Sequence, residues 1–391
     1  MDTVLCRGFL PGWIANRLQP VPDPDRIERC TSAHVCVSRN IKLFTYGKFL
    51  RNQPMRRREL IKFIIWGIYA RVIGLIPGLN QMSDEWIKVA APATTSNIGP
   101  GFDTFGLALN EPYDIVEGRK TDSGLTISEI TGPGSDIIPT DPEKNSVCIA
   151  AAEVLEKSGG DFGIEFRITK GIRPGSGLGS SGASASGGAY LAHLMCGEKL
   201  TDNELVLCAA RAESVTSGGL HADNVAPSLL GGFTIIRSYD PFDVISIEPP
   251  KDLGIVVTLP NIYIETKEAR KVIPKEVPLE HLVFHVGNAS CLTHGMATGD
   301  LDLIKRSIQD LVSEPNRKKL VPYLDEAEEA ALSAGALTSF LGGSGPCIMS
   351  FYDKNNGDGN VIAENVKSVY TQAGIECESW VTVCGKGCRR V

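Results

Sequence analysis

The stretch Pro174–Ser184, which reads PGSGLGSSGAS, decides the fold of this chain. The preceding residues Ile164–Thr169 alternate between apolar and polar side chains as a β-strand does, and Ser180–Cys196 is alanine-rich and predicts a helix despite its glycines. A glycine-rich loop between a strand and a helix N-terminus presents several backbone N–H groups, and the helix dipole adds partial positive charge. The stretch therefore predicts a cradle for a phosphate group.

Two common phosphate motifs do not match this loop. A Walker A loop would end in Gly-Lys-Ser or Gly-Lys-Thr, and the spacing Gly175-x-Gly177-x-Gly179 lacks the x-x-Gly ending of a dinucleotide-binding fingerprint. A flexible Gly/Ser connector is the alternative interpretation, although the run is short and patterned apolar segments flank it directly. On the loop alone, both interpretations stay open.

Two further stretches decide between them. Ala91–Asp103 reads APATTSNIGPGFD, and Ala336–Cys347 reads ALTSFLGGSGPC. With the central loop, and in this order, they resemble the three motifs of the GHMP small-molecule kinases, a family that includes galactokinase, homoserine kinase, mevalonate kinase and phosphomevalonate kinase. The resemblance covers essentially all of residues 86–391 and implies an ATP-dependent small-molecule kinase, which is a phosphotransferase with an alcohol acceptor.

Strand and helix patterns are mixed without strict alternation, which indicates an α+β fold rich in antiparallel sheets. Strands are expected at 86–90, 113–117, 124–130, 164–169, 233–237, 244–248, 254–259, 347–352 and 377–383, and helices at 146–157, 181–196, 202–216, 267–272, 279–298, 300–313, 323–333 and 361–373. The resemblance implies the two-domain GHMP kinase fold, with the active site between the domains. A ribosomal protein S5 domain 2-like, ATP-binding N-terminal domain would cover 82–240, and a ferredoxin-like C-terminal domain would cover 241–391.

Residues 1–81 do not share the resemblance. They carry thirteen Lys and Arg against five Asp and Glu, whereas the remainder holds 26 basic and 41 acidic residues, a net charge of −15. Within them, Leu60–Pro77 is an apolar run after three arginines and suggests a membrane anchor, but Lys62 and Arg71 interrupt it. We favour a mis-assigned start, with Met82 as the initiator, over a real interfacial segment, and expect no stable membrane insertion.

The composition bounds the partners and the compartment. With 42% hydrophobic and 22% charged residues the chain is typical of globular proteins, and its acidic body argues against a nucleic-acid partner. The eleven cysteines are scattered, which favours reduced thiols over disulfides or a zinc site and indicates a cytoplasmic protein. The resemblance implies a homodimer.

The resemblance also places ATP and Mg²⁺. Mg²⁺ would be held by Ser181 and Glu213, and the alanines three and four residues before Glu213 suggest that it lies on a packed helix face, where a carboxylate needs a cationic partner. A solvated surface position is the alternative for Glu213, and a helix N-cap is the alternative for Asn145. The expected ATP contacts are Asn145, Pro174, Gly175, Ser176, Gly177, Leu178, Gly179, Ser180, Ser181, Gly182 and Ala183.

The stretch Gly219–Phe233, GLHADNVAPSLLGGF, resembles the branch of the family that phosphorylates L-homoserine. The resemblance implies transfer of the ATP γ-phosphoryl group to the side-chain hydroxyl of L-homoserine, which gives O-phospho-L-homoserine and ADP in threonine biosynthesis. Arginine forks suit a carboxylate, and an aspartate suits an ammonium group. The residues implied to bind this substrate are Asn97, Asp103, His221, Arg270 and Arg317, and those implied near the reacting groups are Asn97, Ser181 and Thr266.

Three alternatives remain at this point. Another phosphotransferase of the family, acting on mevalonate, shikimate or a sugar, would leave the paired Asp103 and arginines unexplained, because those substrates lack an ammonium group. A decarboxylase of the same fold has the same difficulty. A non-catalytic metabolite sensor would have no need of Glu213. Asp223 is a candidate base, although its place in a turn also suits a structural role.

Overall fold

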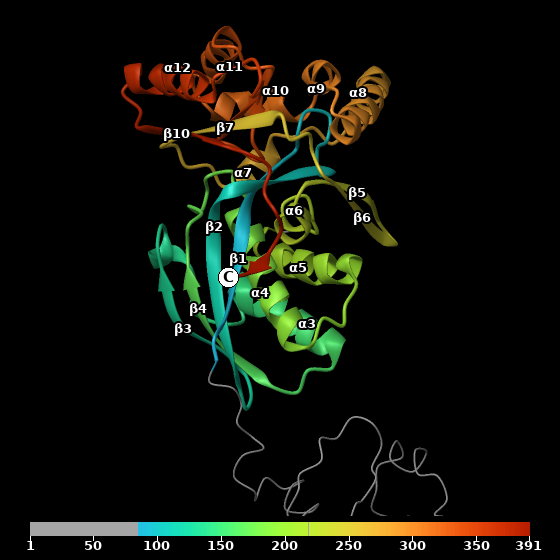
Figure 1. Ribbon diagram of the computed structural model, residues 1–391, viewed down its shortest axis with the longest axis vertical. Helices are drawn as coiled ribbons and strands as arrows, with labels where there is room; N and C mark the ends of the chain where they lie inside the picture. The colour runs from blue at the N-terminus through green and yellow to red at the C-terminus, as the bar shows by residue number, and fades with distance from the viewer. Residues whose placement is uncertain (1–84, 218) are drawn as a thin grey trace, which may run out of the picture. The chain divides into compact units, whose positions relative to one another are not determined.

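The computed structural model describes residues 85–217 and 219–391 of the chain (Figure 1). The predicted basic extension at 1–81, its apolar run Leu60–Pro77 and the expected start at Met82 all lie outside these described residues. Within the described part, no helix combines the length and the apolar character needed to span a bilayer.

A seven-stranded sheet carries the first half of the described chain. Its main order is β11-β1-β2-β4-β3, and β5 pairs with β2 and β6. The pairs are antiparallel except for β3 with β4. The strands are β1 (Ile87–Ser96), β2 (Phe105–Thr121), β3 (Leu125–Thr131), β4 (Gly163–Thr169), β5 (Phe233–Tyr239), β6 (Phe242–Ile247) and β11 (Arg389–Arg390).

Four helices lie against this sheet (Figure 1): α3 (Ser146–Ser158), α4 (Ser180–Met195), α5 (Asp202–Ser217) and α6 (Val225–Leu230). The glycines of α4 permit its close packing. A Cβ at Gly187 would lie 2.6 Å from a methyl group of Val116 in β2, and one at Gly188 would lie 2.2 Å from the Val147 carbonyl oxygen of α3. The helix therefore tolerates glycines that weaken its intrinsic propensity, because they let its backbone approach both neighbours.

A four-stranded sheet of order β10-β7-β9-β8 carries the second half. Its strands are β7 (Leu253–Pro260), β8 (Thr338–Leu341), β9 (Ile348–Asp353) and β10 (Cys377–Thr382). Every residue of β7 is buried: Ile255 and Val257 join the core that reaches the first sheet, and Val256 joins a second core beneath α11 (Leu324–Ser333) and α12 (Gly359–Gln372). Alternate side chains of one strand thus serve two cores.

Four further helices and two 3₁₀ turns complete the described chain. They are α7 (Thr266–Lys271), α8 (Leu279–Thr298), α9 (Leu301–Ser307), α10 (Ser313–Arg317), and the 3₁₀ turns η2 (Ser135–Ile137) and η3 (Lys318–Leu320). The α+β class predicted from the sequence is confirmed. The prediction of a single helix over 300–313 is wrong, because α9 ends at Ser307 and α10 begins only at Ser313. There the Asp310 carboxylate accepts hydrogen bonds from the N–H groups of Val312 and Ser313 and starts α10.

The chain crosses between the sheets after residue 247 rather than at the expected boundary of 240. The hairpin β5–β6 keeps residues 233–247 in the first sheet. At the other end of the chain, β11 returns to pair with β1, so the last residues also lie in the first sheet (Figure 1). Both ends of the second half are therefore anchored to the first.

Glu328 in α11 makes folding sensitive to pH. Burial, and then the negative charge of Glu314, raises the pKa of Glu328 above its ordinary 4.5. The folded state therefore holds this proton more tightly than the unfolded state, so its stabilising contribution is present below pH 4.5 and is lost as the pH rises. We expect Glu328→Gln to gain roughly 1–3 kcal/mol of unfolding free energy over wild type between pH 5 and pH 9, measured by urea denaturation. The exposed Glu329→Gln is the control, and equal pH profiles for wild type and Glu328→Gln would contradict the account.

Candidate active site

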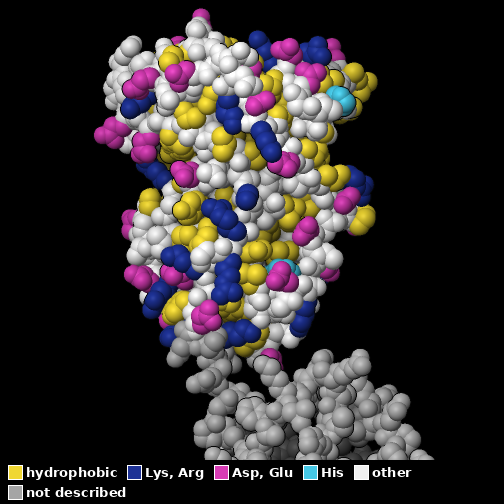
Figure 2. Space-filling view, in the orientation of Figure 1, with side chains coloured by type: hydrophobic (Ala, Val, Ile, Leu, Met, Phe, Trp, Pro, Cys, Tyr) yellow, Lys and Arg dark blue, Asp and Glu magenta, His cyan; other side chains and the backbone are white. Residues whose placement is uncertain are grey.

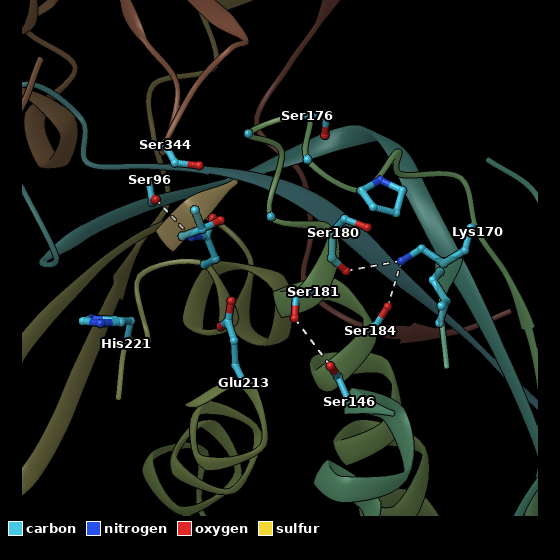
Figure 3. Close-up of a pocket in the computed structure, with 18 of the residues that line it drawn as sticks. Ser96, Ser146, Lys170, Ser176, Ser180, Ser181, Ser184, Glu213, His221 and Ser344 are labelled. Carbon is cyan, nitrogen blue, oxygen red and sulfur yellow. Dashed lines mark hydrogen bonds between the residues drawn. The ribbon is translucent and has the colours of Figure 1, made fainter. Parts of the chain in front are cut away.

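A pocket of about 320 Å³ lies where the three sequence motifs meet (Figure 3). The glycine loop forms one wall, and residues of β1, α5, α7 and the loop after β8 form others. Of the predicted site residues, the pocket lining includes Asn97, Asn145, Pro174, Gly175, Ser176, Gly177, Gly179, Ser180, Ser181, Glu213, His221, Thr266, Arg270 and Arg317.

The glycine loop changes direction at several glycines where it lines the pocket. Gly175, Gly177 and Gly179 have φ values of 72°, 80° and 67°, in the left-handed region that favours glycine. A Cβ at Gly179 would lie 2.1 Å from the Thr94 hydroxyl oxygen, so no other residue fits there. Gly179 is also the N-cap of α4 and supplies no side-chain acceptor to its first turn. The N-terminus of α4 therefore faces the pocket as an anion site.

The end of β1 connects the glycine loop to the third motif. The Thr94 N–H donates to the Leu178 carbonyl at 3.1 Å, and the Ser96 carbonyl accepts from the Gly343 N–H at 3.0 Å. Asn224 adds side-chain links, since its amide donates to the Ser96 hydroxyl at 3.0 Å and accepts from the Thr94 hydroxyl at 2.9 Å. Segments far apart in the sequence are thus hydrogen-bonded into one wall.

A buried ion pair beneath the loop was not predicted from the sequence. Lys170 and Asp114, both almost fully inaccessible, form a salt bridge. The Lys170 ammonium also donates to the Ser184 hydroxyl at 2.8 Å and to the Ser180 carbonyl at 3.3 Å, and Asp114 accepts from the N–H of Ile172 at 3.0 Å. The pair ties the strand before the loop to the helix after it. The one available signal was a lysine directly after a buried strand and before the loop.

Glu213 projects from α5 toward the loop, with Ser181 close by in Figure 3. Ala209 and Ala210 are fully buried, so the packed face predicted for this part of α5 is present. Burial, and then the negative charge of Asp223, raises the pKa of Glu213 to about 8. The Ser181 hydroxyl also lines the pocket and lies 3.4 Å from that of Ser146. Carboxylate and hydroxyl oxygens facing an anion cradle are donors that suit Mg²⁺.

Asp103, Arg270 and His221 form a charged group beside the pocket. The Arg270 guanidinium donates to both carboxylate oxygens of Asp103, at 3.0 and 2.7 Å, and His221 Nδ1 lies 3.6 Å from Asp103 Oδ2. Burial lowers the pKa of His221 below its ordinary 6.5, against the influence of Asp103. His221 is therefore neutral at pH 7 and presents a hydrogen-bonding edge rather than a charge.

Arg317 is 3% exposed and holds backbone groups. Its guanidinium donates to the Gly343 carbonyl at 2.8 Å and to the Ala269 carbonyl at 3.3 Å. The guanidinium groups of Arg317 and Arg270 each lie 5.4 Å from the ring centroid of Phe102. Arg317 thus joins α7 to the third motif and brings a second cation beside Arg270.

Two other predicted residues have defined structural partners. Asn97, at φ 59°, accepts a hydrogen bond from the Asp103 N–H at 2.9 Å and so fixes the turn that carries Asp103. Asn145 is the N-cap of α3, accepts from the Val147 N–H at 2.9 Å and donates to the Pro139 carbonyl at 2.8 Å. The capping interpretation of Asn145 is therefore present in the structure, at a residue that also lines the pocket.

Four predicted site residues lie outside the lining: Asp103, Leu178, Gly182 and Ala183. Leu178 and Ala183 belong to the hydrophobic core, and the Ala183 N–H is bonded to the Gly179 carbonyl at 2.8 Å. Asp103 reaches the pocket through its bond to Arg270. The residues that the sequence did not single out include Ser96, Lys144, Ser146, Lys170, Ser184, Asn224, Gly343 and Ser344.

The buried pair under the loop gives a stability prediction. Lys170→Met leaves the Asp114 carboxylate buried without its cation, and we expect a loss of about 3–5 kcal/mol of unfolding free energy in urea denaturation. The double variant Asp114→Asn/Lys170→Met removes both charges and should recover part of that loss. If the loss in the double variant equalled the sum of the losses in Lys170→Met and Asp114→Asn, the two side chains would not interact.

Two family models match the chain. The GHMP kinases N terminal domain matches residues 145–232, and the GHMP kinases C terminal domain matches residues 292–372. The first range holds the glycine loop, Glu213 and His221, and the second holds Arg317 and the third motif.

Curated and solved relatives agree with these matches. The homoserine kinase of Methanococcus maripaludis is 41% identical over 305 residues, which cover 77% of this chain and 97% of that protein. The homoserine kinase of Pyrococcus abyssi is 39% identical over 303 residues, 77% of this chain and 98% of that protein. The crystal structure of homoserine kinase from Cytophaga hutchinsonii superposes with a TM-score of 0.75 at 38% identity, over 80% of this chain and 99% of that one. The chain belongs to the GHMP kinase family and, within it, to the homoserine kinases.

Proposed function

We propose that this protein transfers the γ-phosphoryl group of ATP to the side-chain hydroxyl of L-homoserine, a reaction that serves threonine biosynthesis. One observation carries the proposal: an acidic and a basic side chain, Asp103 and Arg270, form a bidentate pair beside the phosphate cradle. An α-amino acid offers one ammonium and one carboxylate group, the two charges complementary to this pair. Together with the identity to the homoserine kinases, this arrangement favours an amino acid as phosphoryl acceptor.

Substrate binding would exchange one ion pair for two. The substrate ammonium would replace Arg270 as the partner of the Asp103 carboxylate. The substrate carboxylate would accept hydrogen bonds from the Arg270 guanidinium, and Arg317 would add a second positive charge nearby. The neutral His221, 3.6 Å from Asp103, would complete the ammonium site by accepting a hydrogen bond. Each internal charge thus keeps a partner in both states, which limits the cost of desolvation.

The glycine loop and the N-terminus of α4 would hold the ATP phosphates through backbone N–H groups. Leu178 and Ala183 would shape the loop rather than bind ATP, because their N–H groups are bonded to the Ser176 hydroxyl and the Gly179 carbonyl. The wall formed by Ile137, Ile138 and Pro139 supplies apolar surface on the side of the pocket near Asn145, which suits the nucleotide base.

Glu213 and Ser181, which both line the pocket, would hold a magnesium ion. Mg²⁺ binds through one or two carboxylates and the substrate phosphates rather than through an all-protein cage. This agrees with the described residues, which hold no group of three or more His, Cys, Asp or Glu side chains able to bind a metal. When bound, the ion would neutralise charge on the transferring phosphoryl group.

Catalysis would then depend mainly on positioning. Phosphoryl transfer needs an acceptor hydroxyl held in line with the γ-phosphate and little covalent assistance. Asn97 and Thr266 line the pocket, where they would hold the acceptor hydroxyl. Asp223 also lines it, and burial, followed by the charge of Asp103, raises its pKa to about 6. Asp223 is therefore ionised at pH 7 and remains a candidate base.

A mevalonate- or shikimate-type phosphotransferase is the alternative left from the sequence. The mevalonate kinase of L. major shares the fold with a TM-score of 0.57. At 17% identity this likeness concerns the fold alone. Mevalonate and shikimate carry no ammonium group, so neither would satisfy Asp103. A cytoplasmic location follows from the proposed reaction and agrees with the free thiols of the described residues.

The deciding experiment is a coupled ATPase assay of the full chain with Mg-ATP and a panel of acceptors. L-homoserine is compared with 4-hydroxybutyrate, which lacks the ammonium group, with 3-aminopropanol, which lacks the carboxylate, and with mevalonate and shikimate. We expect kcat/KM for L-homoserine to exceed that of each analogue by at least about 100-fold, since each analogue leaves a charged site group unpaired. Preferred turnover of mevalonate or shikimate would overturn the substrate assignment, and ATP binding without turnover would support a sensor.

Asp103→Asn tests the amino-acid site within this assay. We expect KM for L-homoserine to rise by about 100-fold while KM for ATP stays within about twofold, because a charged hydrogen-bonding partner is lost only on the acceptor side. The exposed Asp240→Asn serves as the control for the same chemical change. Equal effects of Asp103→Asn on both substrates would indicate a general structural role instead.

Glu213→Gln tests the metal site. We expect kcat/KM to fall by more than about 100-fold and the Mg²⁺ concentration for half-maximal activity to rise, since even outer-shell partners of a metal contribute 10- to 100-fold. A magnesium titration at fixed ATP measures both quantities. Glu156→Gln, at an exposed position of α3, is the matched control. An unchanged magnesium dependence in Glu213→Gln would exclude Glu213 as a ligand.

A further inference from the structure

Phe102 contacts both arginines of the candidate acceptor site. The Cζ atoms of Arg270 and Arg317 each lie 5.4 Å from the centroid of the Phe102 ring. The face of an aromatic ring attracts a cation within about 6 Å of its centroid. One ring therefore interacts with two cations that come from separate helices, α7 and α10.

Phe102 does not serve as core packing. It belongs to neither of the two hydrophobic cores that the described residues form. Phe102 is partly buried, whereas Phe105, three residues later, is 2% exposed and packs against Phe233 with ring centroids 5.0 Å apart. The two phenylalanines of this segment thus have different partners: Phe105 contacts apolar side chains, and Phe102 contacts the arginines.

Backbone contacts fix the turn that carries Phe102. The Phe102 carbonyl accepts a hydrogen bond from the Thr104 hydroxyl at 3.2 Å, and the Phe105 N–H donates to the Gly101 carbonyl at 2.9 Å. A Cβ at Gly101 would lie 2.2 Å from the Phe105 ring, so a side chain there would displace Phe105. The Phe102 ring is therefore presented by a turn of defined shape, the same turn that carries Asp103.

The two guanidinium groups repel each other. Burial, and then the positive charge of Arg270, lowers the pKa of Arg317. Arg270 is paired with Asp103, whereas Arg317 donates to backbone carbonyls and forms no ion pair with any described residue. A group that attracts both cations offsets part of this repulsion. The negative face of an aromatic ring does so without adding a carboxylate that would compete with the substrate.

The protein as a whole does not attract anions, so the selection of a carboxylate depends on such local groups. The full chain carries a formal net charge of −7. Figure 2 shows Lys and Arg side chains next to Asp and Glu side chains on the face in view, and the fields of such mixed charges largely cancel at a distance. The arrangement of the two arginines at the pocket is therefore important for holding an acceptor carboxylate.

We propose that Phe102 is a positioning residue that determines specificity for the acceptor carboxylate by holding Arg270 and Arg317 next to each other. This inference rests on the proposed function, in which a substrate carboxylate binds to Arg270. When the substrate ammonium binds Asp103, Arg270 loses its partner and its repulsion from Arg317 increases. The Phe102 ring attracts both cations before and after this exchange, so they stay placed to share the carboxylate. An acceptor without a carboxylate gains nothing from this arrangement.

Steady-state kinetics of the full chain test this role in Phe102→Leu, which removes the aromatic face and keeps an apolar side chain. We expect KM for L-homoserine to rise about 10-fold, with kcat and KM for ATP within about twofold of wild type, because only the carboxylate site loses its cation–π contacts. For 3-aminopropanol, which lacks the carboxylate, kcat/KM should stay within about twofold. Phe162→Leu is the matched control, since it removes a cation–π contact with Lys120 that lies outside the pocket lining.

Phe102→Tyr separates the aromatic face from the shape of the side chain. It retains the ring, so we expect KM for L-homoserine within about threefold of wild type. A Phe102→Tyr enzyme as impaired as Phe102→Leu would overturn the proposal. Equal losses of kcat/KM for L-homoserine and 3-aminopropanol in Phe102→Leu would also overturn it, because they would indicate general packing.

Failure of the proposed function gives a different result. If the wild type prefers mevalonate, the amino-acid assignment is wrong, but mevalonate also carries a carboxylate, so Phe102→Leu should still raise its KM about 10-fold. Titration calorimetry of the same acceptors with Mg²⁺ and a non-hydrolysable ATP analogue makes the comparison without turnover. A wild type that binds no carboxylate acceptor in this titration would overturn both proposals.

Discussion

Two backbone hydrogen bonds at the end of β1 hold the site together. The N–H of Thr94 bonds to the glycine loop at Leu178, and the carbonyl of Ser96 bonds to the third motif at Gly343. In a strand, backbone N–H and carbonyl groups ordinarily bond to neighbouring strands. At this end of β1 they bond instead to two loops of the pocket, so the end of β1 lies in the pocket wall. The positive φ angles of the loop glycines and the close contact of Gly179 with Thr94 follow from this arrangement. These contacts fix the conformation of the loop from several sides, and under the proposed function they would preorganise it for phosphate.

The charged residues in and around the pocket form two separate ion pairs with different surroundings. Lys170 and Asp114 are paired beneath the loop and serve its geometry, whereas Asp103 and Arg270 are paired beside the pocket, where a substrate with both charges can exchange with them. Glu213 also lines the pocket, and burial, followed by the negative charge of Asp223, raises its pKa to about 8. Under the proposed function, a divalent ion bound here would offset both the burial of Glu213 and its repulsion from Asp223. Three carboxylates thus take three roles that their surroundings assign.

Patterns local in sequence were predictable. The loop after β4, the helix after it and the packed face of α5 at Glu213 follow from glycine spacing and apolar periodicity, which act over a few residues. Contacts across long separations were not predictable. Asp114 and Lys170 lie 56 residues apart, and neither stands in a motif. The end of α9 at Ser307 was not predicted. The Asp310 carboxylate accepts hydrogen bonds from backbone N–H groups that a continuous helix would use, and apolar periodicity carries no information on such side-chain bonds.

By itself the sequence determined the α+β class and predicted the phosphate cradle, because both depend on residue types in short, ordered stretches. The charged residues proposed to bind an amino-acid substrate were implied by the resemblance to the GHMP kinases. Only the tertiary structure decided how these residues are used. It paired Asp103 with Arg270, turned Arg317 toward the carbonyls of Gly343 and Ala269, and made Asn145 a helix cap. It also left Leu279, Leu282, Val283 and Val286 of α8 exposed. The physical reason is that partners and burial depend on which segments meet in space, and a side chain's charge, hydrogen bonds and exposure are set by those neighbours.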